Sequence, residues 1–176
     1  MTHARTTASV LTEAATRHGD AVAVIEGASR ISYTTLLTDV RCAASSFRRH
    51  GISAGDVVAV WAPNCIAWIV AALGAQWLGA AVTPLNTRLK GLEAADQLRR
   101  SHARALVMAR HFLGTDYPAL LGGATLPDLD LRIILGEPPA GSMEWQAFLG
   151  AGDPAASALD APPGLTNPGP ASDIIY

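Results

Sequence analysis

The sequence predicts an α/β fold, in which a layered, largely parallel sheet is flanked by helices and preceded by a small hairpin. Short apolar runs that are typical of buried strands alternate with segments of helical periodicity between residues 57 and 135. Such alternation implies right-handed crossovers between parallel strands. Hydrophobic residues make up 49% of the 176 residues and charged residues only 16%, which excludes a disordered chain.

The N-terminal region is expected to contain two helices separated by a hairpin. In order, the expected elements are a helix capped by Thr6 or Thr7 and ending near His18, a strand over 21–25, a hairpin partner containing Ile31 and Tyr33, and a helix over 36–47. Threonine is a favourable helix cap, and Gly19 and Gly51 follow the two helices as stop signals. Alternation with polar neighbours is the evidence for the hairpin partner.

The sheet is expected to form from residue 57 onward. The predicted elements are strand 57–61, helix 66–78, strand 80–83, helix 92–98, strand 105–108, a mixed segment, strand 131–135 and a short helix over 143–149. The strands are apolar throughout, because both faces of a parallel sheet are covered by helices.

An uncharged run between Asp56 and Arg88 is the one candidate for a membrane span. Prolines at 63 and 84 interrupt both ends of its apolar part, and neither flank carries a basic cluster that would orient insertion. We therefore interpret the run as strand, helix and strand, and expect a cytoplasmic protein without a transmembrane span. An N-terminal signal peptide is also not evident.

Composition and motifs exclude several classes of function. A formal net charge of -2 gives no electrostatic reason to bind nucleic acid. Cys42 and Cys65 have no partners at disulfide or metal-ligand spacing, so no metal site is predicted. The chain contains neither G-x-G-x-x-G after a strand nor G-x-x-x-x-G-K-[ST], and we identify no catalytic residue. Asp128 and Asp130 are interpreted as a solvated turn rather than paired catalytic carboxylates.

Three segments in order resemble signatures of the adenylate-forming (AMP-binding) enzymes. They are Ile31-Ser32-Tyr33-Thr34-Thr35-Leu36, then Gln76-Trp77-Leu78-Gly79-Ala80-Ala81-Val82-Thr83-Pro84-Leu85-Asn86, and finally Asp173-Ile174-Ile175-Tyr176. The last is similar to the residues that precede the family's Gly/Ser/Thr-rich phosphate loop. Within the superfamily, which includes luciferases and peptide-synthetase adenylation domains, the chain resembles the N-terminal part of actinobacterial fatty-acid-CoA ligases.

The resemblance implies an incomplete N-terminal part of the adenylate-forming fold. Residues 1–150 would be the α/β part of the AMP-binding large domain, 151–172 a Pro/Gly-rich connection, and 173–176 the start of the strand before the phosphate loop. An apolar strand is an unusual end for a chain, so we expect the front part of a larger fold. An unfinished sheet is expected to leave apolar surface exposed, which invites homo-oligomerisation and is compatible with peripheral membrane contact.

The function implied by the resemblance is ATP-dependent acyl-CoA ligation. A carboxylic acid, here a fatty acid or a steroid-derived acid, would react with ATP in the presence of Mg²⁺ to give an acyl-adenylate, and its acyl group would pass to coenzyme A. In related ligases an Arg in the Asn-x-Arg-Leu stretch contacts coenzyme A phosphates, and Arg88 occupies that place, with Lys90 as a second charge. The groups that bind ATP lie beyond Tyr176 in the family, so the chain alone is expected to be inactive.

Two other classes of function remain open on the sequence. The chain could be a non-catalytic interaction module, or a subunit of a split enzyme, that retains the fold and pairs with another chain. A doubly wound nucleotide-binding domain of an oxidoreductase is disfavoured, because the glycine fingerprint that such a domain needs is missing. Binding of coenzyme A, of NAD or of neither would discriminate among the three.

Overall fold

A five-stranded parallel sheet lies at the centre of the computed structural model, which describes residues 6–154. The strands run in the spatial order β4-β3-β5-β8-β9. Their bounds are β3 Val57–Trp61, β4 Ala81–Pro84, β5 Ala103–Ala109, β8 Leu131–Leu135 and β9 Met143–Glu144. The predicted α/β fold with a largely parallel sheet is therefore confirmed.

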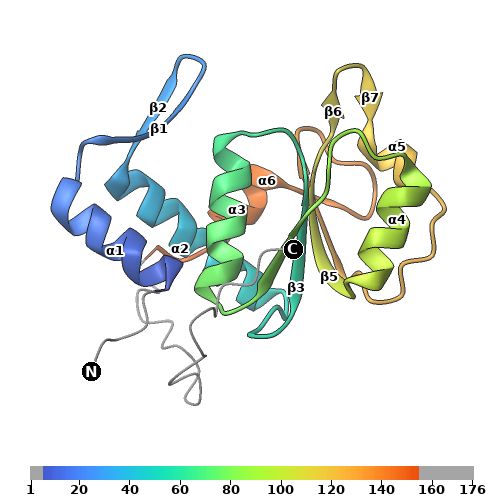
Figure 1. Cartoon of the computed structure of the whole chain (residues 1–176), viewed down its shortest axis with the longest axis horizontal. Helices are drawn as coiled ribbons and strands as arrows, with labels where there is room; N and C mark the ends of the chain where they lie inside the picture. The colour runs from blue at the N-terminus through green and yellow to red at the C-terminus, as the bar shows by residue number, and fades with distance from the viewer. Residues whose placement is uncertain (1–5, 155–176) are drawn as a thin grey trace.

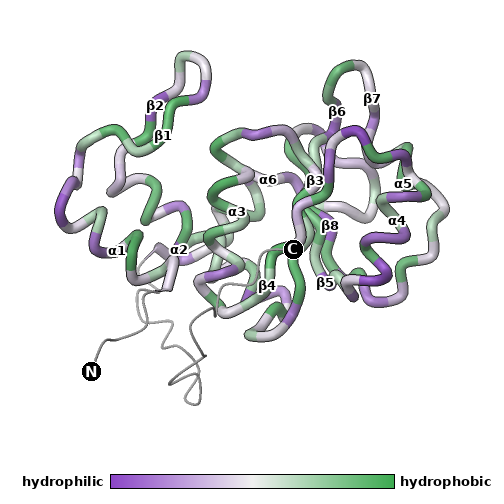
Figure 2. The backbone as a smooth tube through the Cα atoms, viewed as in Figure 1, coloured by the Kyte–Doolittle hydropathy of each residue, from purple (hydrophilic) through white to green (hydrophobic). Residues whose placement is uncertain are grey.

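Helices cover both faces of the sheet. They are α2 (Tyr33–Arg49), α3 (Ile66–Trp77) and α6 (Trp145–Gly150) on one side, and α4 (Gly91–Arg100) and α5 (Tyr117–Leu121) on the other (Figure 1). In Figure 2 the central strands are mostly hydrophobic, whereas α4 carries hydrophilic stretches, and the charged residues of α4 are exposed. This distribution follows from burial, because a strand covered on both faces has no solvent side.

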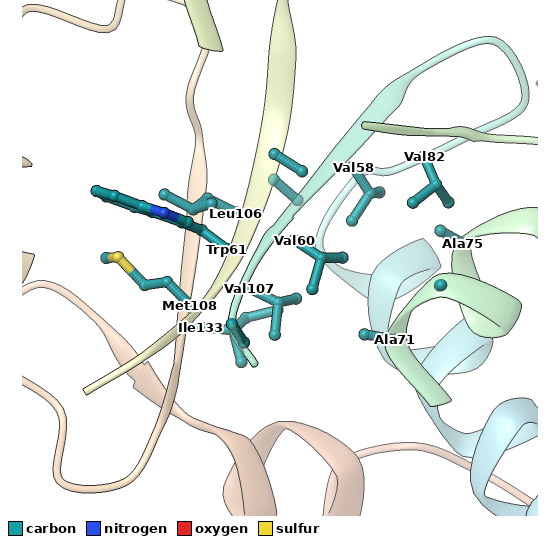
Figure 3. Close-up of a cluster of buried hydrophobic side chains, with 14 of the residues drawn as sticks. Val58, Val60, Trp61, Ala71, Ala75, Val82, Leu106, Val107, Met108 and Ile133 are labelled. Atoms are coloured by element: carbon teal, nitrogen blue, oxygen red, sulfur yellow. The ribbon is translucent and has the colours of Figure 1, made fainter. Parts of the chain in front are cut away.

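Side chains of β3 alternate between the two layers. Val58 and Val60 point toward Ala71 and Ala75 of α3, while Trp61 points to the opposite side of the sheet (Figure 3). All of these side chains have no accessible surface. The alternation is the two-residue period of an extended strand, and it places the one aromatic ring of β3, that of Trp61, in the α5 layer.

The N-terminal elements are α1 (Thr7–His18), the antiparallel hairpin β1 (Val22–Glu26) and β2 (Ser29–Ser32), and α2. Thr6 caps α1 by accepting a hydrogen bond from the Ser9 amide at 3.1 Å, as predicted. The assignment of Tyr33 to the hairpin is wrong, since it is the first residue of α2. The Ser32 side chain caps this helix by accepting the Thr35 amide at 3.1 Å, and this cap ends the strand one residue earlier.

The uncharged run divides into β3, α3 and β4, as interpreted from its prolines. Among the described residues, no helix combines the length and apolarity that crossing a bilayer requires. The rise of an α-helix explains this, because the twelve residues of α3 extend only about 18 Å.

Several short elements differ from the prediction. The mixed segment forms the hairpin of β6 (His111–Phe112) and β7 (Thr115–Asp116) followed by α5. The helix predicted over 143–149 begins only at Trp145, because Met143 and Glu144 pair with β8 as strand β9 and the Glu144 carboxylate caps the helix. The predicted connection over 151–172 lies mostly, and the strand start over 173–176 wholly, outside the described residues.

Candidate functional site

The candidate site lies at the carboxyl ends of the parallel strands. From β3 the chain passes to β4 on one side and then crosses to β5 on the other. The segments that follow β3 and β5 leave toward opposite faces of the sheet (Figure 1). Open α/β sheets bind ligands outside the carboxyl ends of the strands at such a reversal, because the diverging loops leave a crevice there.

The loop between β4 and α4 carries Arg88 and Lys90 at this edge of the sheet. The Asn86 Oδ1 atom accepts the Arg88 backbone amide at 2.9 Å, and the Asn86 carbonyl accepts the Leu89 amide at 3.1 Å. These hydrogen bonds form a tight local turn, a typical role for asparagine. Arg88 is exposed, and among residues 6–154 no hydrogen bond or ion pair engages its guanidinium.

Lys90 lies at the junction between this loop and α4. It is the N-cap residue of the helix and is exposed, and its backbone amide donates to the Glu93 carboxylate at 2.8 Å. A carboxylate in the first turn is favoured by the helix dipole, so Glu93 is explained by helix stability. The structure thus places both predicted cations on one loop at the carboxyl edge of the sheet.

Two buried aromatic side chains contact the backbone of the same loop. Trp61 Nε1 donates to the Asn86 carbonyl at 3.0 Å, and the Tyr117 hydroxyl donates to the Thr87 carbonyl at 2.9 Å. Their rings meet edge to face, with centroids 4.7 Å apart and an interplanar angle of 84°. No local sequence pattern indicates either residue, since the hydrogen bonds join positions 25 and 30 residues apart.

Arg110 is a further cation at this edge, and no sequence motif indicates it. It directly follows β5 and pairs with Asp116, whose carboxylate also accepts the Ala119 amide at 3.0 Å. The Ala119 amide and the Arg110 guanidinium together hold the pKa of Asp116 below its usual value. Because Arg110 is already paired, we assign it to holding the β6–β7 hairpin against α5 rather than to binding a ligand.

Two hollows lie near the sheet, and neither contains Arg88 or Lys90. One, of about 880 Å³, extends along α4 and is lined by Val57, Thr83, Leu89, Leu92, Glu93, Asp96, Gln97, Arg100 and Ser101. Its two carboxylates make it unsuited to a polyanion. The other, of about 370 Å³, lies at the opposite, amino edge of the strands.

At the amino edge, Arg104 binds Asp56 at 3.2 Å and Asp130 at 2.6 Å, so its charge is already neutralised. Asp128 accepts from His102 at 3.0 Å. The predicted turn at 128–130 is thus solvent-exposed and in addition ion-paired with β5. Within residues 6–154, no group of three or more His, Cys, Asp or Glu side chains is placed to hold a metal ion.

The resemblance motifs occupy defined structural positions. Ser32-Tyr33 forms the start of α2, and the second motif forms the end of α3, a turn at Gly79, strand β4 and the loop as far as Asn86. Gly79 has a φ of 78°, which favours glycine. The third motif lies outside the described residues.

Comparisons with known proteins agree with these motifs. Residues 11–167 match the AMP-binding enzyme family. The chain is 36% identical over 179 residues to a 3-[(3aS,4S,7aS)-7a-methyl-1,5-dioxo-octahydro-1H-inden-4-yl]propanoyl:CoA ligase of Rhodococcus jostii, covering 97% of this chain and 35% of the relative. It is 38% identical to the ligase of the same name from Mycobacterium tuberculosis, covering 89% and 31%. The chain therefore spans about a third of the length of these relatives.

Solved structures share the fold. An anthranilate CoA ligase in complex with anthranoyl-AMP matches with a TM-score of 0.79 and 19% identity, over 88% of this chain and 29% of that one. The N-terminal domain of FACL13 from Mycobacterium tuberculosis matches with a TM-score of 0.73 and 22% identity, over 85% and 36%. With these matches, the motifs and the parallel sheet lead to one conclusion: the chain belongs to the AMP-binding enzyme family and corresponds to the N-terminal part of its acyl-CoA ligases.

Proposed function

We propose that this chain forms the N-terminal part of an ATP-dependent acyl-CoA ligase and contributes to binding coenzyme A through Arg88. The reaction would join a carboxylic acid to ATP, giving an acyl-adenylate and pyrophosphate, and would then transfer the acyl group to the thiol of coenzyme A. Family membership over residues 11–167 supports the reaction class. The observation that carries the coenzyme A assignment is the guanidinium of Arg88, which is exposed at the carboxyl edge of the sheet and has no partner among residues 6–154.

The Arg88 side chain suits a phosphate for two reasons. A guanidinium presents a planar fork of donors that matches phosphate oxygens, and no described residue competes for it. Lys90, two residues later, would add a compact positive charge on a flexible side chain. Coenzyme A supplies the acyl-accepting thiol, so these cations would hold its nucleotide end and have no part in bond making.

The groups that bind ATP and Mg²⁺ would come from elsewhere in the family fold. The sequence contains no glycine-rich phosphate loop, and residues 6–154 contain no carboxylate cluster suited to a metal ion. We therefore expect the 176-residue chain alone to be inactive in acid activation.

For the acid, we propose a steroid-derived acid ahead of a simple fatty acid. The support is that the relatives from Rhodococcus jostii and Mycobacterium tuberculosis are both named as ligases of a propanoate carried by a methylated, fused bicyclic dione.

Three further expectations from the sequence stay predictions. They are a cytoplasmic location, homo-oligomerisation and peripheral membrane contact.

The coenzyme A assignment is tested by titrating the 176-residue chain with coenzyme A and following amide signals by NMR. Arg88→Ala should weaken binding by about tenfold or more, because it removes charge-assisted hydrogen bonds to phosphate. Arg30→Ala is the matched control, since Arg30 is an exposed arginine on β2, and it should bind like the wild type.

Equal affinities of the Arg88→Ala variant and the wild type would contradict the assignment. Absence of coenzyme A binding by the wild-type chain would instead favour the interaction-module alternative.

A further inference from the structure

The loop that carries Arg88 is held by two side chains that lie in the protein core. Trp61 has no accessible surface and Tyr117 is 1% exposed, yet each donates a hydrogen bond to a carbonyl of the loop. The two acceptors, Asn86 and Thr87, are consecutive residues, and Thr87 directly precedes Arg88. A pair of buried donors therefore contacts the two peptide units immediately before the proposed phosphate-binding residue.

These two hydrogen bonds fix the position of the loop, because the donors are buried and no water can replace the loop carbonyls as acceptors. If the loop moved away, the indole N–H and the phenol O–H would remain buried without acceptors, which is costly. Burial also raises the pKa of Tyr117, so its hydroxyl stays protonated and donates at neutral pH. The edge-to-face contact between the rings holds the indole N–H and the phenol O–H in position to donate to the two carbonyls.

We propose that Trp61 and Tyr117 are positioning residues that hold the Arg88 loop in the geometry in which it binds coenzyme A. This inference rests on the proposed function of Arg88. Neither aromatic side chain contacts the coenzyme, and both act through the backbone at Asn86 and Thr87. An exposed arginine on a fixed backbone loses less conformational freedom on binding than one on a mobile loop, which increases affinity.

Tyr117→Phe is the informative variant, because it removes the hydroxyl and keeps the ring that packs against Trp61. We expect faster exchange of the Arg88 amide with solvent, measured by NMR on the full chain, and coenzyme A binding weakened about threefold. Tyr33→Phe is the matched control. It deletes the same atom from a tyrosine at the start of α2, and should change neither quantity.

A double-mutant cycle separates positioning from a general effect on stability. In the Arg88→Ala background, Tyr117→Phe should still speed amide exchange in the loop but should not weaken coenzyme A binding further. An equal loss of affinity in both backgrounds would overturn the inference, as would unchanged exchange and affinity in Tyr117→Phe. Unchanged affinity in Arg88→Ala alone would overturn the proposed function, and with it this inference. In that case, faster amide exchange in Tyr117→Phe would still show that the Tyr117 hydroxyl holds the loop, but not that the held loop binds coenzyme A.

Discussion

At the scale of single residues, Asp116 makes stability depend on pH. Its carboxylate accepts the Ala119 amide and pairs with Arg110, and both interactions lower its pKa. A carboxylate whose pKa is lower in the folded state than in the unfolded state stabilises the fold. This stabilisation is fully present at pH values above the pKa of the unfolded state, about 4. That contribution is lost as the pH falls through the folded pKa.

We therefore expect the urea midpoint of unfolding to decrease as the pH is lowered from about 5 toward 3. Asp116→Asn should be less stable at pH 7 and should show a shallower decrease, since it no longer titrates. Asp20→Asn, an exposed aspartate after α1, should retain the wild-type slope. A wild-type slope in Asp116→Asn would contradict the prediction. The measurement is urea unfolding followed by tryptophan fluorescence.

At the scale of elements, the close packing of α2 against α3 depends on Gly74. A Cβ atom built on Gly74 would lie 2.7 Å from the Cβ of Ala43 and 3.2 Å from the backbone nitrogen of Ala44. The second contact is to helix backbone, which cannot move without shifting all of α2. Three small residues thus allow the two helices to approach closely.

Gly74→Ala should lower the free energy of unfolding. Overpacking costs about 1 to 3 kcal/mol, more than the roughly 0.5 to 1 kcal/mol by which alanine favours a helix over glycine. Gly150→Ala in α6 is the control, because its Cβ would meet no atom within 4 Å, and it should leave stability unchanged or raise it. Urea unfolding at pH 7 measures both variants. A Gly74→Ala protein at least as stable as the wild type would show that the helices separate at little cost.

At the scale of the whole molecule, the described residues include exposed Arg88 and Lys90, proposed here to bind phosphate, but no carboxylate cluster placed to hold Mg²⁺. We expect the purified 176-residue chain to catalyse no acid-dependent exchange of pyrophosphate into ATP, with fatty acids or with steroid-derived acids. Dispersed amide signals in the NMR spectrum of the same preparation serve as the control that the protein is folded. Exchange that requires the acid and co-purifies with the chain would refute this expectation.

Local sequence signals predicted the long elements well and the short ones poorly. The strands β3, β4, β5 and β8 and the helices α1 to α4 follow from apolar periodicity and from caps such as Thr6 and Gly19. The segment between β5 and β8 was missed, because two-residue strands and a five-residue helix are shorter than any periodic pattern. At Tyr33, alternation predicted a strand, but the Ser32 cap began a helix instead.

The sequence by itself determined the fold class, the family and the placing of Arg88 and Lys90 on one loop after a strand. Each of these follows from residues close together in the chain, such as the motif that ends at Asn86. Only the tertiary structure decided that Trp61 and Tyr117 hold that loop and that Arg110 is already paired. Such contacts join segments that are distant in sequence, and they form only after the strand order and helix packing bring those segments together.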